Sequence, residues 1–236
     1  MKKTVGIIGG MGPAATCDLM EKIIALTKAS CDQEHLHVIT DNNTAIPDRT
    51  AAILRGGDDP TPELIKSARR LEAAGAEVLI MACNTAHYFY DSVAAAVDVQ
   101  VLHMPREAAA VLRGADIKTV GVLASEGTVE SGVYEKALAE AGIKAVYPSP
   151  TMQKQVTRLI YEGVKARSVP LADIPVEDIL QSLRAQGAEK FLLACTELPI
   201  AFAHLGKMEN CLDATRVLAF ATVRAAGAET TASDPW

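Results

Sequence analysis

The chain repeats itself once, and this repeat constrains the fold more than any other feature of the sequence. Residues 75–83 read GAEVLIMAC, and residues 187–195 read GAEKFLLAC, 112 residues later. Earlier in each half, residues 4–8 (TVGII) match residues 119–123 (TVGVL) at an offset of 115 residues. Because the order and the spacing of the segments are both kept, the repeat predicts two pseudo-equivalent halves. Each half begins with a Val-Gly strand and contains a strand that ends in cysteine.

Within each half, short apolar runs alternate with amphipathic stretches, a pattern typical of βαβ units. It predicts an α/β fold of two pseudo-symmetric α/β domains, each with a central, mainly parallel sheet flanked by helices, and an active site in the cleft between them. The expected strands are residues 4–8, 36–40, 78–81, 99–103, 119–123, 144–147 and 191–194. The expected helices are residues 14–29, 61–75 (with Thr61 as N-cap), 84–97, 105–113, 129–141, 152–166, 175–186 and 214–226 (with Asp213 as N-cap). We expect a polar loop over residues 41–60 and a frayed tail after Gly227.

Length and charge limit the classes of function. The 236 residues suit one large domain or two small ones, at about 150 residues per domain. A formal charge of −6 leaves no basic surplus for nucleic acid or a polybasic membrane contact. No apolar run reaches the ~20 residues of a membrane helix, and Gly9 and Gly10 break the N-terminal run too early for a secretory signal. We therefore expect a cytoplasmic protein that binds a small molecule, not nucleic acid or a membrane.

The cysteines divide into two groups. There are five of them, Cys17, Cys31, Cys83, Cys195 and Cys211, with no CxxC pair. The odd number and wide spacing argue against a disulfide framework or a zinc site, so we expect reduced thiols and no metal. Cys83 and Cys195 recur in register at the carboxyl ends of predicted strands, where open α/β sheets bind ligands. A helix N-terminus at such a position favours the thiolate. The other three have no repeat partner and are interpreted as ordinary.

A pair of thiols on opposite sides of a small ligand suits one reaction. One thiolate removes a proton from one face of a carbon atom, and the other thiol returns a proton to the opposite face, which inverts the stereocentre. Such chemistry needs no cofactor if the carbanion is stabilised. Backbone N–H groups of the glycine-rich loop Gly9–Pro13 and of its repeat counterpart Ser125–Thr128 are candidates to bind the α-carboxylate.

Several motifs connect these thiols with a known family. They are GIIGGMGP (Gly6–Pro13), IPDRT (Ile46–Thr50), MACNTAHYFYD (Met81–Asp91), ASEGTVESGVY (Ala124–Tyr134), IYEGVK (Ile160–Lys165) and LACTELP (Leu193–Pro199). Over residues 4–226 the chain resembles the cofactor-independent aspartate/glutamate racemase superfamily, and within it the aspartate racemases. The family's two catalytic cysteines fall on Cys83 and Cys195. The resemblance implies PLP-independent interconversion of L- and D-aspartate by these thiols, without a cofactor, in a homodimer.

The resemblance also implies roles for other residues. Arg49 and Lys165 would hold the carboxylates of a dicarboxylic substrate. The remaining substrate-binding candidates are Met11, Gly12, Asn84, Thr85, Ser125, Thr128, Thr196 and Glu197. Glutamate racemases carry histidine where Glu197 stands, which favours aspartate as the substrate. His87 is expected to pack or cap and is not among the catalytic candidates. The family fold implies a discontinuous first domain (1–102 plus 208–236) and a second domain over 103–207.

Other functions stay open from the sequence. Gly10–Ala15 fits the dinucleotide fingerprint G-x-G-x-x-A, with Asp41 as a candidate ribose ligand, so an NAD-dependent oxidoreductase is one alternative. It leaves the repeated cysteines unexplained. Racemisation of glutamate or other amino acids, a hydantoin racemase or a maleate isomerase would use the same two-cysteine scaffold. An inactive binding protein that retains the anion site is a further class.

Overall fold

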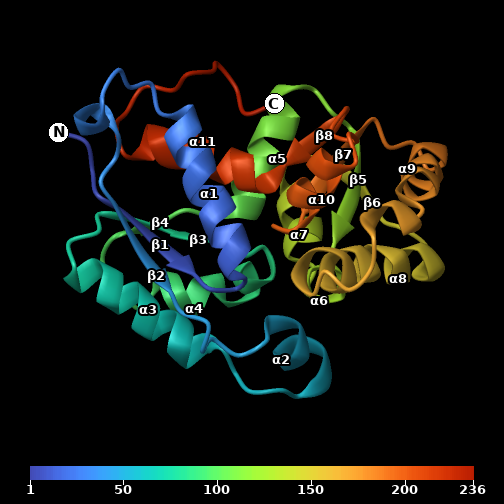
Figure 1. The fold of residues 1–236 in the computed structure, drawn as a ribbon, viewed down its shortest axis with the longest axis horizontal. Helices are drawn as coiled ribbons and strands as arrows, with labels where there is room; N and C mark the ends of the chain where they lie inside the picture. Colours follow the sequence, from blue (N-terminus) through green and yellow to red (C-terminus); the bar gives the residue numbers. More distant parts are fainter.

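Two four-stranded parallel sheets, one in each half of the chain, form the framework of the computed structural model, which describes residues 1–236. The strand order is β2-β1-β3-β4 in the first sheet and β6-β5-β7-β8 in the second (Figure 1). The strands are β1 (Val5–Gly9), β2 (Val38–Asn42), β3 (Val78–Met81), β4 (Gln100–Val101), β5 (Thr119–Ala124), β6 (Lys144–Val146), β7 (Lys190–Ala194) and β8 (Cys211–Asp213). The predicted α/β fold of two similar halves is confirmed.

The repeated Val-Gly pair occupies the same place in both sheets. The central strand β1 pairs with β2 and β3, and the central strand β5 pairs with β6 and β7. A Cβ atom added to Gly6 would lie 3.2 Å from the Leu71 Cβ, and one added to Gly121 would lie 3.2 Å from the Leu183 Cβ. The glycine therefore recurs because a helix leucine packs directly on the central strand of each sheet.

The helices cover both faces of each sheet. They are α1 (Pro13–Leu26), α2 (Arg49–Arg55), α3 (Thr61–Ala73), α4 (Tyr90–Ala94), α5 (Met104–Gly114), α6 (Glu126–Glu130), α7 (Val133–Glu140), α8 (Pro150–Arg158), α9 (Val176–Ala185), α10 (Leu198–His204) and α11 (Ala214–Ala225). Side chains of α1, α5, α7 and α11 share one core of 30 buried residues with strands of both sheets. Smaller cores lie under α3 and α4 in the first half and under α8, α9 and α10 in the second. The largest core thus joins the two halves, and the domain boundaries expected from the sequence stay a prediction.

Several element predictions were wrong, mostly where helices are short. The predicted loop over residues 41–60 contains helix α2, whose Asp48 side chain accepts a hydrogen bond from Ala51 N–H (2.6 Å). The predicted helix over residues 84–97 is a 3₁₀ turn (Thr85–Phe89) followed by α4. The predicted helix over 129–141 is divided into α6 and α7, because Gly132 at φ 66° cannot continue a right-handed helix.

Three further differences concern helix ends and a short strand. Residues 152–166 form α8 and then a π-helical segment, Leu159–Lys165. Helix α3 is preceded by Pro60, and the Asp59 carboxylate, not Thr61, accepts from the first N–H (2.9 Å). The three-residue strand β8 was missed. By contrast, Asp213 is confirmed as the N-cap of α11, since its carboxylate accepts from Thr215 N–H (2.8 Å).

The predicted frayed tail is wrong as well. The backbone of the tail pairs with the end of α1, where Thr231 N–H donates to Leu26 O and Lys28 N–H donates to Glu229 O (both 2.9 Å). Pro235 is buried and accepts a hydrogen bond from Arg216 Nε (3.1 Å). The two backbone contacts join residues about 200 positions apart, which local composition does not report.

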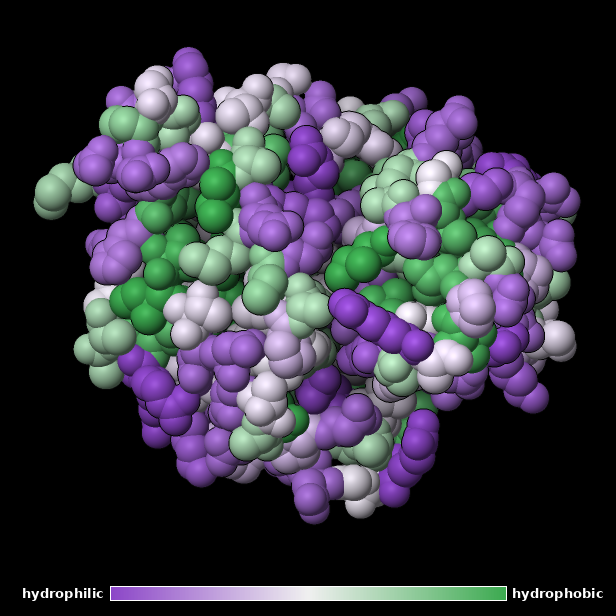
Figure 2. All heavy atoms as spheres, in the orientation of Figure 1, coloured by the Kyte–Doolittle hydropathy of each residue, from purple (hydrophilic) through white to green (hydrophobic).

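The length and polarity of the helices bear on whether one could span a membrane. None of the helices has both the length and the apolar character needed to cross a bilayer. On the face drawn in Figure 2, hydrophilic side chains lie between smaller groups of hydrophobic ones.

Candidate active site

The two repeated thiols lie at the carboxyl ends of equivalent strands. Cys83 follows β3 and precedes the 3₁₀ turn Thr85–Phe89, while Cys195 follows β7 and precedes α10. Both are buried, with 6% and 8% of their surface exposed. Both line the same cavity, which has a free volume of about 20 Å³. The structure therefore brings the two thiols to one small site between the halves.

Most of the predicted site residues surround this cavity. Its lining consists of Met11, Asp48, Arg49, Thr50, Cys83, Asn84, Thr85, Ser125, Ile160, Tyr161, Lys165, Cys195, Thr196 and Glu197. Of the predicted residues, only Gly12 and Thr128 are not in the lining. A Cβ atom on Gly12 would lie 3.7 Å from Glu197 Oε1, so its backbone passes beside the site.

Four lining residues were missed by the sequence reasoning. They are Asp48, Thr50, Ile160 and Tyr161. Each adjoins a predicted residue or belongs to its motif, since IPDRT contains Arg49 and IYEGVK contains Lys165. The motifs were therefore the available signal, although spacing alone does not show which of their side chains point inward.

Three hydroxyl groups join the two halves beside the cavity. Thr85 Oγ1 lies 2.7 Å from Thr128 Oγ1 and 3.1 Å from Ser125 Oγ, and the latter two are 3.0 Å apart. All three side chains are buried. Ser125 also caps α6, where it accepts from Thr128 N–H (3.3 Å). This closed cluster explains why Thr128 supports the site without lining the cavity.

Cys195 has a carboxylate neighbour. Its Sγ donates to Glu197 Oε2 at 3.2 Å, and Thr196 Oγ1 donates to the same oxygen at 3.0 Å. Lys165 Nζ lies 3.3 Å from Glu197 Oε1. Burial, followed by the Glu197 carboxylate, raises the pKa of the Cys195 thiol well above its ordinary value. Burial acts to lower the pKa of Lys165, but the Glu197 carboxylate and the thiols together raise it.

Two lining residues carry donor groups without an acceptor. The Arg49 guanidinium donates to the carbonyls of Pro47 (2.9 Å) and Met11 (3.1 Å), while its buried Nε has no partner. Asn84 Oδ1 accepts from the Tyr134 hydroxyl, while the buried Asn84 Nδ2 has no partner. Buried donors are nearly always satisfied in native proteins. An anionic ligand in the cavity would satisfy both.

The cavity is closed in this structure. A free volume of about 20 Å³ holds roughly one water molecule, so an amino acid requires movement of the walls. Asp48, Thr50 and Tyr161 also line a surface depression of about 410 Å³. Tyr161 Oη donates a hydrogen bond to Thr50 Oγ1 (3.5 Å). Thr50 of α2 and Tyr161 of the π-helical segment therefore separate the cavity from this surface depression.

Comparisons with known proteins agree with this geometry. Residues 8–226 match the family described as Asp/Glu/Hydantoin racemase. The chain belongs to this family. It is similar to the broad specificity amino-acid racemase RacX of Bacillus subtilis, with 27% identity over 225 residues that cover 93% of this chain and 96% of the relative.

Solved structures show the same fold. The aspartate racemase of Picrophilus torridus superposes with a TM-score of 0.87 at 32% identity, over 97% of this chain and 96% of that one. The glutamate racemase of Francisella tularensis, in complex with D-glutamate, superposes with a TM-score of 0.68 at 16% identity, over 99% and 86% of the two chains. At 16% identity, the similarity to the glutamate racemase shows a shared fold and nothing more.

The family match confirms the resemblance found in the motifs. It supports an amino-acid racemase, an isomerase that acts on a small amino-acid substrate. It gives no support to the alternative of an NAD-dependent oxidoreductase. Asp41, the candidate ribose ligand of that alternative, instead forms an ion pair with Arg70.

Proposed function

We propose that this protein interconverts L- and D-aspartate without PLP or another cofactor, with Cys83 and Cys195 as the two proton carriers. One observation carries the proposal: the two thiols that the repeat pairs line a single cavity together with Arg49, Lys165 and Glu197. A site with one thiol on each side of a carbon atom can deprotonate one face and protonate the other.

The proposed cycle needs one cysteine as the thiolate and the other as the thiol. The Cys195 thiol donates a hydrogen bond to Glu197, so it is the protonated partner in this structure. In one direction the Cys83 thiolate takes the Cα proton, and Cys195 delivers its proton to the opposite face. In the other direction the roles reverse, with the Cys195 thiolate as base and the Cys83 thiol as acid. In the first direction a turnover leaves Cys83 protonated and Cys195 as the thiolate, so Cys83 must release a proton to solvent and Cys195 must take one up to restore the starting state.

The charges of the site suit an acidic amino acid. Among the lining residues, Arg49 and Lys165 supply two cations, and Glu197 supplies the one buried carboxylate, since Asp48 is exposed and caps α2. Aspartate has two carboxylates and one ammonium group, so the pattern is complementary in number and sign. The unpartnered Arg49 Nε and Asn84 Nδ2 would bind carboxylate oxygens, and Lys165 would exchange part of its contact with Glu197 for the substrate. The likeness to the Picrophilus torridus enzyme favours aspartate over glutamate.

The test is a chiral assay in D₂O without PLP. L-aspartate should racemise and gain deuterium at Cα, and glutamate and neutral amino acids should react more slowly. Faster racemisation of glutamate, or equal rates across the panel, would reassign the substrate within the same scaffold. Thermal stabilisation by NAD, with no racemisation of any amino acid, would favour the oxidoreductase alternative.

The homodimer and the cytoplasmic location belong to this proposal too. Both come from the sequence: the homodimer follows from the resemblance, and the location goes with the expectation of reduced cysteines. Light scattering on the eluted protein would measure its mass, and a mass of one chain would refute the dimer.

A further inference from the structure

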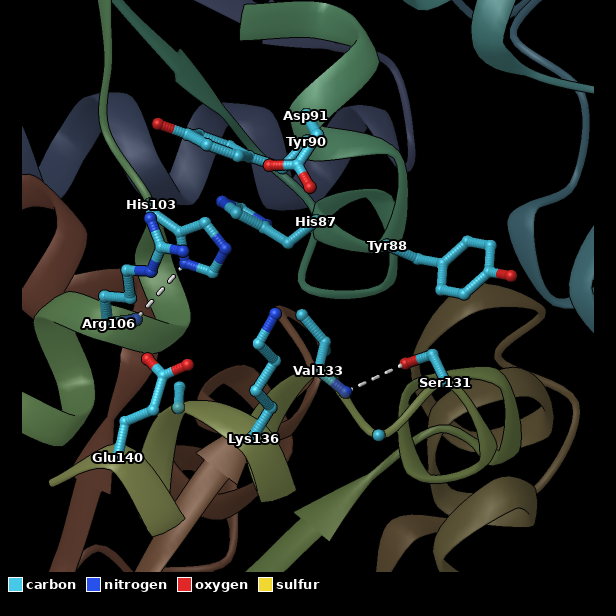
Figure 3. A pocket seen from close by; sticks show the side chains of 12 residues that line it. His87, Tyr88, Tyr90, Asp91, His103, Arg106, Ser131, Val133, Lys136 and Glu140 are labelled. Carbon is cyan, nitrogen blue, oxygen red and sulfur yellow. Dashed lines mark hydrogen bonds between the residues drawn. The ribbon is translucent and has the colours of Figure 1, made fainter. Parts of the chain in front are cut away.

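His87 is a buried imidazole that the proposed reaction leaves without a role. It projects from the 3₁₀ turn that follows Cys83, and 2% of its surface is exposed. Its ring lies between the strand end that carries Cys83 and the start of α5, beside His103 and Tyr90 (Figure 3). The ring centroids of His87 and His103 are 5.2 Å apart.

Two hydrogen bonds determine the protonation state of this ring. Met104 N–H donates to His87 Nε2 (3.1 Å), so this nitrogen carries no proton. His87 Nδ1 lies 2.9 Å from the Cys83 carbonyl oxygen, an acceptor, so Nδ1 must carry the proton and donate it. The geometry is satisfied only by the neutral Nδ1–H tautomer. Burial, followed by the nearby His103, lowers the pKa of His87 to about 3, in agreement with a neutral ring.

The second half of the molecule holds its thiol residue differently. The Cys195 carbonyl accepts from the backbone N–H of Leu198 (3.0 Å). The residue that corresponds to His87 at the offset of 112 is Pro199. In the first half, therefore, a side chain supplies the hydrogen bond that the backbone supplies in the second half. Only Cys83 depends on an imidazole for the position of its carbonyl group.

We propose that His87 is a positioning residue for Cys83, which links the backbone of this cysteine to the N-terminus of α5 and so fixes the direction of its thiol in the cavity. The inference rests on the proposed function, in which Cys83 transfers the Cα proton. His87 itself does not reach the reacting atoms, because it lines a separate cavity of about 190 Å³ that contains neither thiol. The other histidine and the charged residues that line this cavity are His103, Asp91, Arg106, Lys136 and Glu140.

Two amide variants separate the two hydrogen bonds of the ring. In His87→Asn the side-chain amide occupies the place of Nδ1 and still donates to the Cys83 carbonyl, but the hydrogen bond from Met104 N–H is lost. In His87→Gln the amide reaches the place of Nε2 and still accepts from Met104 N–H, but the hydrogen bond to the Cys83 carbonyl is lost. The control is His103→Asn, on the same cavity wall, because asparagine also caps a helix N-terminus.

The proposal predicts that His87→Gln loses kcat with little change in KM. Since a misplacement of about 1 Å costs up to about 100-fold in rate, we expect a loss of about 10- to 100-fold. His87→Asn should retain most of the activity, and His103→Asn should match the wild type. The pH profile should keep its shape above about pH 5 in all three, because the pKa of His87 is lowered to about 3 and that of His103 to about 4, mainly by burial, so both rings are neutral there.

Isotope effects distinguish positioning from general loss of structure. With [2-²H]-L- and [2-²H]-D-aspartate, slower transfer at Cys83 raises the substrate isotope effect in the direction where Cys83 takes the proton, and lowers it in the other. A merely structural defect leaves both effects unchanged. Wild-type activity in His87→Gln, or equal losses in His87→Gln and His87→Asn with unchanged isotope effects, would overturn the proposal.

A second readout does not depend on racemisation. Alkylation by iodoacetamide, followed at each cysteine by mass spectrometry, should change at Cys83 relative to Cys195 in His87→Gln and not in His87→Asn. If the wild type racemises no amino acid, the proposed function fails, while this ratio still decides whether His87 positions Cys83. An unchanged ratio would then refute the positioning role.

Discussion

Single side chains make the two thiols chemically unequal although the repeat makes them topologically equivalent. Cys195 contacts the Glu197 carboxylate through its thiol, and Cys83 contacts His87 through its backbone. At the repeat offset, Glu197 corresponds to Thr85, which belongs to the hydroxyl cluster. The unlike neighbours suit a substrate whose Cα carries different groups on its two sides.

Serine at either thiol position should abolish racemisation, because a hydroxyl does not ionise near neutral pH. We expect Cys83→Ser and Cys195→Ser to lose about 10²- to 10⁴-fold in kcat, the usual contribution of a general acid or base. Chiral chromatography of aspartate measures the loss. Cys17→Ser, at an exposed thiol on α1, is the control and should keep full activity. Racemisation by Cys83→Ser at the wild-type rate would show that the two-thiol assignment is wrong.

Glu197→Gln should lower the pKa of Cys195. The carboxylate raises that pKa by repelling the thiolate, so its removal lets the thiolate form at lower pH, next to an unpaired Lys165. The pH dependence of Cys195 alkylation should therefore move to lower pH. Thr196→Val is the control, since it removes one hydrogen bond to Glu197 but keeps the charge. A shift to higher pH in Glu197→Gln would contradict the electrostatic interpretation.

At the scale of elements, the short helix α2 closes the site. It carries Arg49 and Thr50 in its first turn, and Thr50 packs against α6 of the other half. A Cβ atom on Gly127 would lie 2.5 Å from Thr50 Oγ1 and 2.9 Å from the Thr50 Cα. Glycine at residue 127 is thus required for α2 to approach α6, because any side chain there displaces the Thr50 backbone.

Gly127→Ala should therefore move α2 and with it Arg49. Overpacking of this kind costs about 1–3 kcal/mol of stability, and we expect the KM for aspartate to rise more than kcat falls. Steady-state kinetics and thermal unfolding measure the two effects. Gly114→Ala, where the new Cβ atom meets nothing within 4 Å, is the matched control. An unchanged KM in Gly127→Ala would show that α2 is not needed to hold the substrate.

At the scale of the whole molecule, one core spans both halves. It includes Val5 of β1, Val120 of β5 and Leu218 of α11. Helix α11, near the end of the chain, lies in the middle of the molecule and packs against α1 and α5 (Figure 1). Because neither half buries its inner face without this shared layer, the two halves should unfold together.

Leu218→Ala tests this coupling. Leu218 is fully buried, and truncation of such a leucine costs about 2–5 kcal/mol. We expect a single urea transition at a lower midpoint, with the same midpoint by far-UV circular dichroism and by tryptophan fluorescence. The single tryptophan, Trp236, reports on the second half, because its ring lies against Lys190 Nζ. Ile24→Ala, at an exposed position of α1, should change stability by less than about 0.5 kcal/mol. Two separate transitions would instead indicate independently folding domains.

The sequence by itself determined the features that repeat or that depend on local periodicity. Alternating apolar and amphipathic segments were sufficient to predict the two parallel sheets and most of the long helices, because backbone periodicity and burial act over a few neighbouring residues. The repeat was sufficient to select Cys83 and Cys195, because equivalent strands place equivalent ends at equivalent sites. The motifs were sufficient for most of the cavity lining, including Arg49 and Lys165.

Only the tertiary structure decided the features that depend on contacts between distant segments. Helix α2 is too short to show a periodic pattern, and it is stabilised by its cap and by packing on α6. The tail is held by backbone hydrogen bonds to the end of α1, and no local sequence pattern predicts this pairing. The closure of the cavity by Thr50 and Tyr161 has the same origin. The role inferred for His87 does too, since Met104 and Cys83 approach its ring only after the sheet and α5 have packed.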